Sequence, residues 1–295
     1  MFRDAVSQAI QFTLPVIISF RTVGGTCQSG SGTCVVVNDE GWIVTAAHLL
    51  KHLDDLHQAE AKTRALEAQV GGSAGGQADK NLNRKERRKR AALGKGPLPT
   101  DIDRWSVWWG RDGWIVDPQS VTLIEPADIA VARIDGFDPK SIAQYPTFKD
   151  PKKGIDAGTS LCRLGFPFYR IESDWDAAAG RFQLKNSPPP IFPNEGILSR
   201  MTELVLVDPA GNVLPPPPFP LKMIETSSAG IRGQSGGPIF DQHGTVWGIQ
   251  SATTSYEMDL NTAEKQYYHV GVGVHVETIM GLFETTGIKF AISTY

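Results

Sequence analysis

Residues 230–240, "GIRGQSGGPIF", place one serine, Ser235, between glycines and just ahead of a proline. Glycine is used where the backbone must turn sharply or where another group approaches it closely. The surroundings of Ser235 therefore predict a site in which main-chain atoms, rather than side chains, lie around a hydroxyl. Because short motifs recur by chance, the segment alone is equally compatible with a surface turn, and the other motifs of the chain carry the decision.

Length and composition are those of an ordinary globular protein. The chain has 295 residues, of which 41% are hydrophobic and 21% charged, enough for one large core or two smaller ones. A formal net charge of -3 gives no general attraction to nucleic acid or to an anionic membrane. Any contact of that kind must depend on a local cluster of charge.

The chain has three cysteines, Cys27, Cys34 and Cys162. An odd number this small does not fit a disulfide framework. The N-terminal stretch has charges at Asp4 and Arg21 and makes a poor signal peptide. No apolar run approaches the ~20 residues of a membrane span. These features predict a cytoplasmic protein that does not contact a membrane.

Short runs rich in β-forming residues recur along the chain and end at turn residues such as "NDEG" (38–41) and "DQHG" (241–244). A short helix followed by a first strand is expected at the N-terminus. The predicted strands lie at residues 15–23, 32–37, 41–47, 129–134, 159–166, 203–207, 245–252 and 267–276. Many short strands with few helical patterns predict an all-β barrel or sandwich.

Two segments depart from this pattern and are interpreted as insertions. Residues 49–70 have helical spacing of leucines, and a glycine-rich joint (71–76) follows, so that an insertion of about 51–110 carries a helix and a flexible arm. Residues 168–222 contain "NSPPPIFP" and "LPPPPFP", which predict an extended surface loop because proline cannot donate to a strand ladder.

Two further motifs accompany the serine segment. "GWIVTAAHLL" ends a predicted strand at His48, and "EPADIAVARI" opens another at Asp128, so the order along the chain is His, Asp, Ser. This constellation resembles the trypsin-like serine peptidases, and the layout of residues 225–240 is most similar to the intracellular, HtrA-like branch. The resemblance implies two packed six-stranded β-barrels, at residues 1–145 and 146–295, with substrate between them.

The resemblance also implies a serine endopeptidase that works through an acyl-enzyme. A serine hydroxyl is a weak nucleophile, so a base, His48, must take its proton, and a carboxylate, Asp128, must hold that base in the right tautomer. The N–H groups of Gly233 and Ser235 are the expected oxyanion donors. No His/Cys cluster has the spacing of a metal site, and no cofactor is expected.

The same resemblance implies a primary specificity pocket whose floor holds no carboxylate, since Ala229 lies six residues before Ser235. An arginine or lysine of the substrate would be buried there without a partner, which predicts cleavage after small or medium apolar residues. The expected substrate-binding residues are Ala229, Gly230, Ser251, Ala252, Thr253, Gly271 and Gly273.

The sequence departs from the family pattern in three places. The stretch between His48 and Asp128 is enlarged, Leu49 stands where secreted relatives have a cysteine, and too few residues follow Ser235 for a C-terminal PDZ module. The alternative that remains open is a trypsin-like fold with a silent or gated site that serves as a protein-binding scaffold.

The run "RKERRKR" (84–90) has six basic residues in seven. Like-charge runs next to flexible joints are usually solvated and mobile. The functional alternative is a docking arm for an acidic protein or nucleic acid, and both interpretations remain open.

Overall fold

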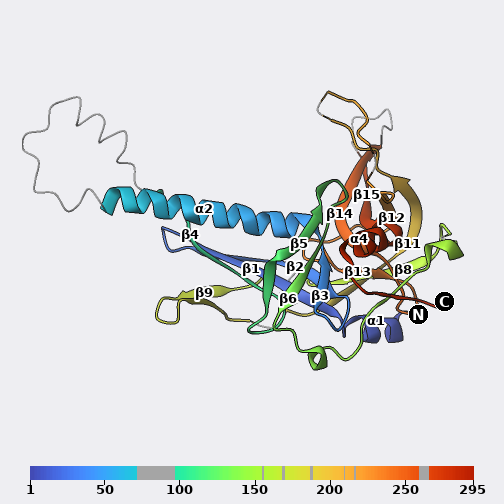
Figure 1. Ribbon diagram of the computed structural model, residues 1–295, viewed down its shortest axis with the longest axis horizontal. Helices are drawn as coiled ribbons and strands as arrows, with labels where there is room; N and C mark the ends of the chain where they lie inside the picture. The colour runs from blue at the N-terminus through green and yellow to red at the C-terminus, as the bar shows by residue number, and fades with distance from the viewer. Residues whose placement is uncertain are drawn as a thin grey trace, which may run out of the picture.

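The computed structural model of the chain describes residues 1–71, 97–154, 156–167, 170–186, 189–208, 210–215, 217–258 and 266–295. Two β-sheets lie side by side, and a long helix runs along the first of them (Figure 1). The expected N-terminal helix and first strand are confirmed as α1 (Arg3–Ala9) and β1 (Thr13–Thr22). The basic run at 84–90 lies outside the described residues.

The first sheet has six strands in the order β4-β1-β2-β3-β6-β5. Its central strands are continuous apolar runs whose inward residues are completely buried, among them Val35, Val44 and Val131. Within the described residues no pairing joins β4 to β5, so this sheet is open. The strands after β1 are β2 (Cys27–Val36), β3 (Trp42–Thr45), β4 (Ile102–Trp108), β5 (Ile115–Ile124) and β6 (Ile129–Asp135).

The second sheet is a closed barrel. Its strands follow the order β13-β8-β11-β12-β15-β14, and an additional β13–β14 pairing closes the ring, while β7 and β16 extend it beyond β14. The expected all-β fold of two packed six-stranded units is therefore confirmed, with only the second unit closed. The strands are β7 (Thr147–Phe148), β8 (Ser160–Gly165), β11 (Phe192–Glu203), β12 (Lys222–Thr226), β13 (Pro238–Phe240), β14 (Val246–Met258), β15 (Gln266–His275) and β16 (Ala291–Ile292).

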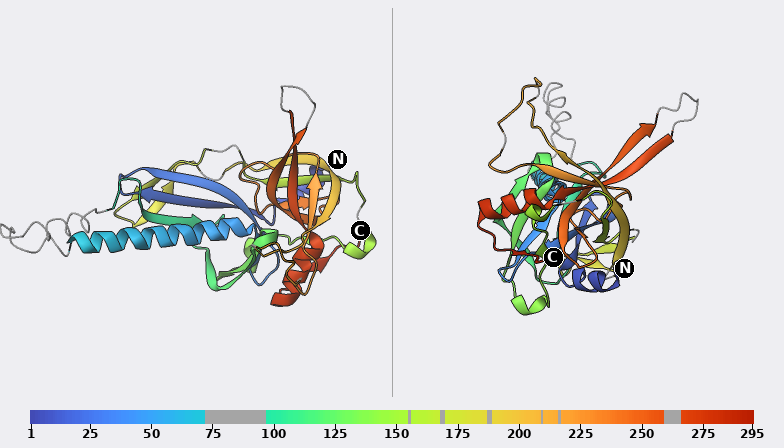
Figure 2. Two further views of the ribbon diagram at one scale, coloured as in Figure 1. Left: turned by 90° about the horizontal axis from the view of Figure 1, so that it is seen from above. Right: turned by 90° about the vertical axis from the view of Figure 1, so that its right-hand side faces the viewer.

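Helix α2 (Ala47–Gly71) confirms the helix expected at 49–70. It packs along β4 (Figure 2). The helix buries Leu56 and Thr63, and the His57 ring meets the Trp105 ring edge to face, with centroids 6.4 Å apart. The range 51–110 for the first insertion is too long, because β4 lies within it and pairs with β1. The sequence of β4 mixes tryptophan with charged residues, so it lacks the apolar run that predicts the other strands.

The interpretation of 168–222 as a surface loop is wrong in part. The segment holds a hairpin, β9 (Ser173–Asp176) with β10 (Arg181–Leu184), and then the barrel strand β11, which pairs with β8 and β12. The proline-rich stretch ends where β11 begins, and proline is tolerated at the start of a strand. The strand expected at 203–207 is also absent, since β11 ends at Glu203 and a single bridge joins Val207 to Val213.

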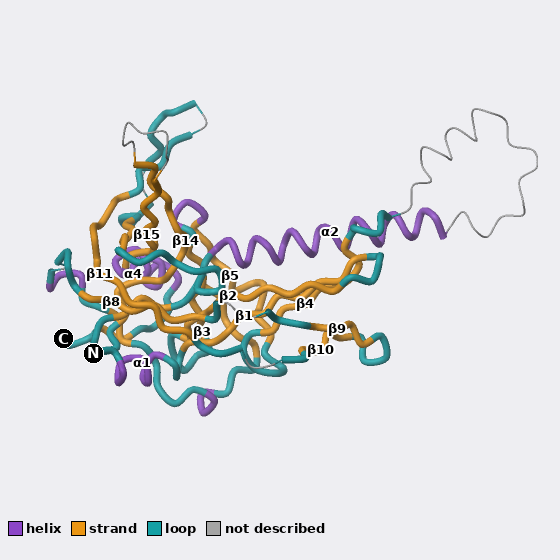
Figure 3. The backbone as a smooth tube through the Cα atoms, turned by 180° about the vertical axis from the view of Figure 1, so that it is seen from behind, coloured by secondary structure: helices purple, strands orange, loops and turns teal. Residues whose placement is uncertain are grey.

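Helix α4 (Val276–Thr286) follows β15 and packs on β14 and β15 (Figure 3). His275 caps its N-terminus, since the ring Nδ1 accepts a hydrogen bond from the Glu277 N–H at 3.1 Å. Three short 3₁₀ turns, at Glu125–Ala127, Pro139–Ser141 and Pro151–Lys153, connect strands. None of the helices in the described part of the chain has the length and apolarity needed to cross a membrane.

Candidate active site

His48 lies in the first turn of α2, directly after strand β3, where the chain leaves the first sheet. Its ring Nδ1 lies 2.9 Å from Asp128 Oδ2 and 3.1 Å from Oδ1, and its backbone N–H donates to Oδ1 at 2.8 Å. The His48 side chain is 49% exposed, whereas that of Asp128 is 23% exposed. The carboxylate therefore fixes one edge of the imidazole and leaves the other edge toward solvent.

Asp128 follows the 3₁₀ turn Glu125–Ala127 and has φ 54°, the single left-handed non-glycine residue among those described. This conformation is uncommon outside glycine, asparagine and aspartate. It aims the carboxylate back at His48, and the Asp128 carbonyl accepts the N–H of Ala47 at 3.2 Å. The strain is thus stored where the two side chains meet.

Ser251, in strand β14, donates its hydroxyl to Asp128 Oδ2 at 2.6 Å. Burial alone would raise the pKa of Asp128, but hydrogen bonds from the His48 ring, from Ser251 and from the His48 N–H outweigh it, so the pKa lies below its ordinary value. The carboxylate is consequently ionised at neutral pH. The sequence predicted Ser251 only as a pocket wall and did not reveal this bond, because β14 and Asp128 are far apart along the chain.

The loop that carries Ser235 depends on glycine at two positions. Gly233 has φ +98° and Gly236 has φ +85°, and a Cβ on Gly233 would lie 2.5 Å from the Phe166 carbonyl oxygen. The loop is tied to strand β2 of the first sheet, since the Thr33 N–H donates to Ser235 O at 2.8 Å and the Thr33 hydroxyl donates to Gly233 O at 2.7 Å. Glycine is therefore needed because two backbones approach each other here.

The N–H groups of Gly233 and Ser235 in this loop donate to no acceptor among the described residues, whereas the Gly233 carbonyl accepts from the Phe166 N–H at 3.2 Å and from the Thr33 hydroxyl. Because buried N–H groups are almost always paired, two adjacent free donors beside a hydroxyl are a candidate anion site.

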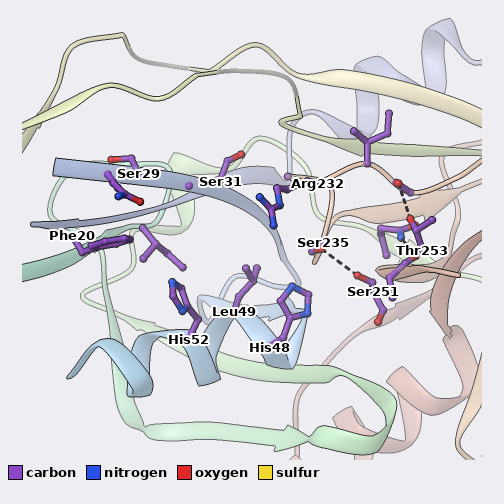
Figure 4. A pocket seen from close by; sticks show the side chains of 18 residues that line it. Phe20, Ser29, Ser31, His48, Leu49, His52, Arg232, Ser235, Ser251 and Thr253 are labelled. Carbon is purple, nitrogen blue, oxygen red and sulfur yellow. Dashed lines mark hydrogen bonds between the residues drawn. The ribbon is translucent and has the colours of Figure 1, made fainter. Parts of the chain in front are cut away.

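The Ser235 hydroxyl donates to the Ser251 carbonyl oxygen at 3.2 Å, and no hydrogen bond joins it to His48 in this structure. His48 and Ser235 nevertheless line the same cavity (Figure 4). Side-chain rotation of a serine crosses a small barrier and is fast. The predicted residues His48, Asp128 and Ser235 are therefore assembled, with the serine in a resting rotamer.

The cavity has a volume of about 720 Å³ and lies between β2, the first turn of α2, the Ser235 loop and β14. The predicted pocket residues that line it are Gly230, Ser251, Ala252 and Thr253. The Thr253 hydroxyl donates to Gly230 O at 2.7 Å, which joins the two walls. The sequence did not predict that Phe20, His52 and Arg232 also line the cavity.

Three predicted pocket residues, Ala229, Gly271 and Gly273, do not line this cavity. The Ala229 carbonyl accepts from Asn194 at 2.9 Å, and the Gly271 N–H donates to Ser228 O at 2.9 Å. Gly273 packs toward Ile239 inside the barrel. Ala229 and Gly271 thus lie beneath the lining, and Gly273 lies in the core.

The three cysteines carry free thiols. Burial raises the pKa of Cys34 to about 12 and that of Cys162 to about 11. Because the thiolate is the reactive form of cysteine, these two thiols are inert at neutral pH.

Comparison with known proteins identifies the family of the chain. The family model described as "Trypsin-like peptidase domain" matches residues 32–249. No curated protein sequence gives a significant match. Among solved structures, the active form of the Rv3671c protease from M. tuberculosis is 14% identical over 98% of this chain and 87% of that chain, with a TM-score of 0.47. The HtrA-type protease AlgW with tripeptide is 17% identical, with a TM-score of 0.49; the match covers 98% of this chain and 64% of AlgW.

Proposed function

The chain belongs to the trypsin-like peptidase family and is a serine endopeptidase, and we propose that Ser235 is its nucleophile, His48 its general base and Asp128 the carboxylate that orients the base. The observation that carries this proposal is the hydrogen bond of His48 Nδ1 to Asp128 at 2.9 Å, in a cavity that also holds Ser235. An imidazole held at Nδ1 presents Nε2 as the proton acceptor.

The proposed reaction begins when the Ser235 side chain turns from the Ser251 carbonyl toward His48 Nε2. His48 takes the hydroxyl proton as Ser235 Oγ attacks the substrate carbonyl. The resulting oxyanion accepts hydrogen bonds from the N–H groups of Gly233 and Ser235. The C–N bond then breaks, His48 donates its proton to the leaving amine, and an acyl-enzyme remains. Water, deprotonated by His48, releases the acid and restores Ser235.

A gated site is the second candidate, and two observations favour it. The Ser235 hydroxyl is bound to Ser251 O, and the Thr253 hydroxyl bridges the pocket to Gly230 O. A protein that stays in this state would bind partners without cleaving them. An active enzyme has to break both hydrogen bonds when substrate enters.

Labelling with a fluorophosphonate separates the two candidates, because the reagent needs an activated hydroxyl and a formed oxyanion site. We expect the wild-type protein to be labelled at Ser235. Ser235→Ala should not be labelled, and Ser199→Ala, which alters an exposed serine of β11, should be labelled like the wild type. Absence of labelling in folded wild-type protein would favour the scaffold.

Two finer expectations stay predictions. Cleavage after small or medium apolar residues depends on the absence of a carboxylate near Ala229. Docking of an acidic protein or nucleic acid on residues 84–90 concerns a segment outside the described residues. Deletion of residues 71–96 tests the second: an inert segment leaves peptide hydrolysis and partner binding unchanged, whereas a docking arm is needed for salt-sensitive binding.

A further inference from the structure

Arg163, in strand β8, is a buried cation without a charged partner. Arg163 is 1% exposed. Its one hydrogen bond runs from Nη1 to the Ser228 hydroxyl, at 2.7 Å. The Nε and Nη2 atoms have no partner, and no described carboxylate forms an ion pair with the guanidinium. Burial lowers the pKa of Arg163 to about 10, so the side chain is still charged at neutral pH.

A charge in this position is unusual, since arginine is almost never fully buried unless it is paired. Removing one guanidinium from water is costly, and a single neutral hydroxyl does not compensate for it. Buried donors that remain unpaired in a native protein call for an explanation, and a bound water, an ion or a ligand group can supply one.

The guanidinium lies directly below the candidate specificity pocket. A Cβ built on Gly271 would lie 2.6 Å from Arg163 Cζ, so the head group fills the space over that glycine. Gly271 is paired in the β14–β15 ladder with Thr253, which lines the cavity. Asn194, the neighbour of Arg163 in the β11–β8 ladder, donates to the Ala229 carbonyl. Arg163 is thus one layer of residues beneath the pocket.

We propose that Arg163 is the specificity-determining residue of the primary pocket and binds the side-chain carboxylate of a glutamate or aspartate that precedes the scissile bond. This inference rests on the proposed endopeptidase function. A carboxylate supplies the missing countercharge, and it accepts two hydrogen bonds from an arginine fork, which matches the two unpaired atoms Nε and Nη2. An apolar side chain offers neither.

Arg163 is not part of the cavity lining, so access to it requires a movement of that lining. The hydrogen bond from the Thr253 hydroxyl to Gly230 O, at 2.7 Å, joins two lining residues, and Thr253 is the ladder partner of Gly271, which Arg163 contacts. The entering side chain breaks this neutral bond and forms a charge-assisted pair in its place, which is roughly twice as strong. The pocket is therefore shut to a side chain that brings no charge and opened by one that does.

The first test compares four peptides that differ only in the residue before the scissile bond, which is Glu, Gln, Leu or Lys. Glutamate and glutamine have the same shape, so their ratio isolates the charge. For the wild-type enzyme we expect kcat/KM for Glu to exceed that for Gln by about 10- to 100-fold, the range for a hydrogen bond to a charged group. A Gln, Leu or Lys peptide cut as fast as the Glu peptide overturns the proposal, and a Leu preference restores the apolar expectation from the sequence.

Arg163→Met should abolish the Glu/Gln ratio, and Arg163→Lys should keep part of it. The matched control is Arg200→Met. The Arg200 side chain, on β11, is 55% exposed and forms an ion pair with Glu225 on the neighbouring strand β12. Removing an unpaired buried charge does not break an ion pair, so Arg163→Met should melt at or above the wild-type temperature. An unchanged Glu/Gln ratio in folded Arg163→Met contradicts the proposal.

A binding measurement separates this proposal from the proposed function. The Glu and Gln peptides are titrated into Ser235→Ala, which cannot cleave them, and into Ser235→Ala/Arg163→Met. We expect the Glu peptide to bind about 10-fold more tightly than the Gln peptide to the first protein and equally to the second. If no peptide is cut by the wild type but this difference is present, the catalytic assignment fails and the role of Arg163 stands. Equal binding of both peptides to Ser235→Ala overturns it.

Discussion

The hydroxyl of Ser235 donates to the carbonyl oxygen of Ser251 at 3.2 Å, while the hydroxyl of Ser251 donates to Asp128 at 2.6 Å. One residue of β14 thus contacts both the proposed nucleophile and the carboxylate that orients the base. Position 251 is 5% exposed, so this link is shielded from water. The resting orientation of Ser235 is therefore held by the same strand that positions Asp128.

Ser235→Ala should abolish peptide hydrolysis, with a fall in kcat of about 10⁶-fold, because no other described hydroxyl lies in the Ser235 loop. The fold should be retained, since the Ser235 hydroxyl makes one hydrogen bond to the main chain. Initial rates and circular dichroism check the two parts. Residual cleavage at the wild-type rate by pure variant protein would refute the assignment of Ser235.

Asp128→Asn should lower kcat by about 10⁴-fold, because an amide favours the wrong His48 tautomer while leaving the geometry intact. Asp135→Asn is the matched control, as Asp135 is an exposed carboxylate at the end of β6, the strand that begins directly after Asp128. Steady-state kinetics on both variants decide the matter. Equal losses in the two variants would show that the effect is one of charge on β6 and not of contact with His48.

Gly233→Ala should lower kcat by about 10²- to 10³-fold through displacement of one oxyanion donor. It should also destabilise the protein, because alanine is strained at φ +98° and its Cβ would lie 2.5 Å from the Phe166 carbonyl oxygen. Gly158→Ala is the control for strain alone, since Gly158 has φ +90° with open space around it. The kcat of Gly158→Ala should equal that of the wild type. Steady-state kinetics and urea unfolding of both variants check the two effects.

His275 predicts a pH dependence of stability. Burial lowers the pKa of His275 from 6.5 to about 4, so between these values the unfolded state binds the extra proton. The contribution of neutral His275 to the free energy of unfolding is complete above pH 6.5 and is lost as the pH falls toward 4. Urea unfolding should show a loss of about 2 kcal/mol between pH 7 and pH 5 from this residue. His275→Asn, which keeps an acceptor for the α4 cap, should remove that loss, while His269→Asn, an exposed site on β15, should keep it.

The three motifs around His48, Asp128 and Ser235 predicted the fold, and the structure brings His48 to Asp128 and to the cavity that Ser235 lines. They succeed because each places its residue at the end of a strand or on a glycine-rich turn, where local sequence determines the backbone. Strands β4 and β11 were missed for the opposite reason. Tryptophan and arginine dilute the apolar pattern of β4, prolines precede β11, and tertiary pairing rather than propensity makes both into strands.

The proposed role of Arg163 was not predicted from the sequence. Spacing from Ser235 identified Ala229 and could not identify Arg163, which lies far away along the chain and pairs with Asn194 in the β8–β11 ladder. The available signal was a charged residue in the middle of "TSLCRLGF", an otherwise apolar run. A charge in such a run is either outward and solvated or inward and functional, and only the packed structure distinguishes these.

The attachment of the Ser235 loop to Thr33 determines how the protein loses activity on heating. Thr33 belongs to the open first sheet, whereas the loop belongs to the closed barrel. Proteins open locally and sub-globally, in contiguous units, before the whole chain unfolds, and the hydrogen bonds of Thr33 join two such units. Each such opening frees the main-chain oxygen of Ser235 from its donor. The catalytic lifetime is therefore governed by sub-global opening, and the deuterium-exchange rate of the Thr33 amide should track the rate of thermal inactivation.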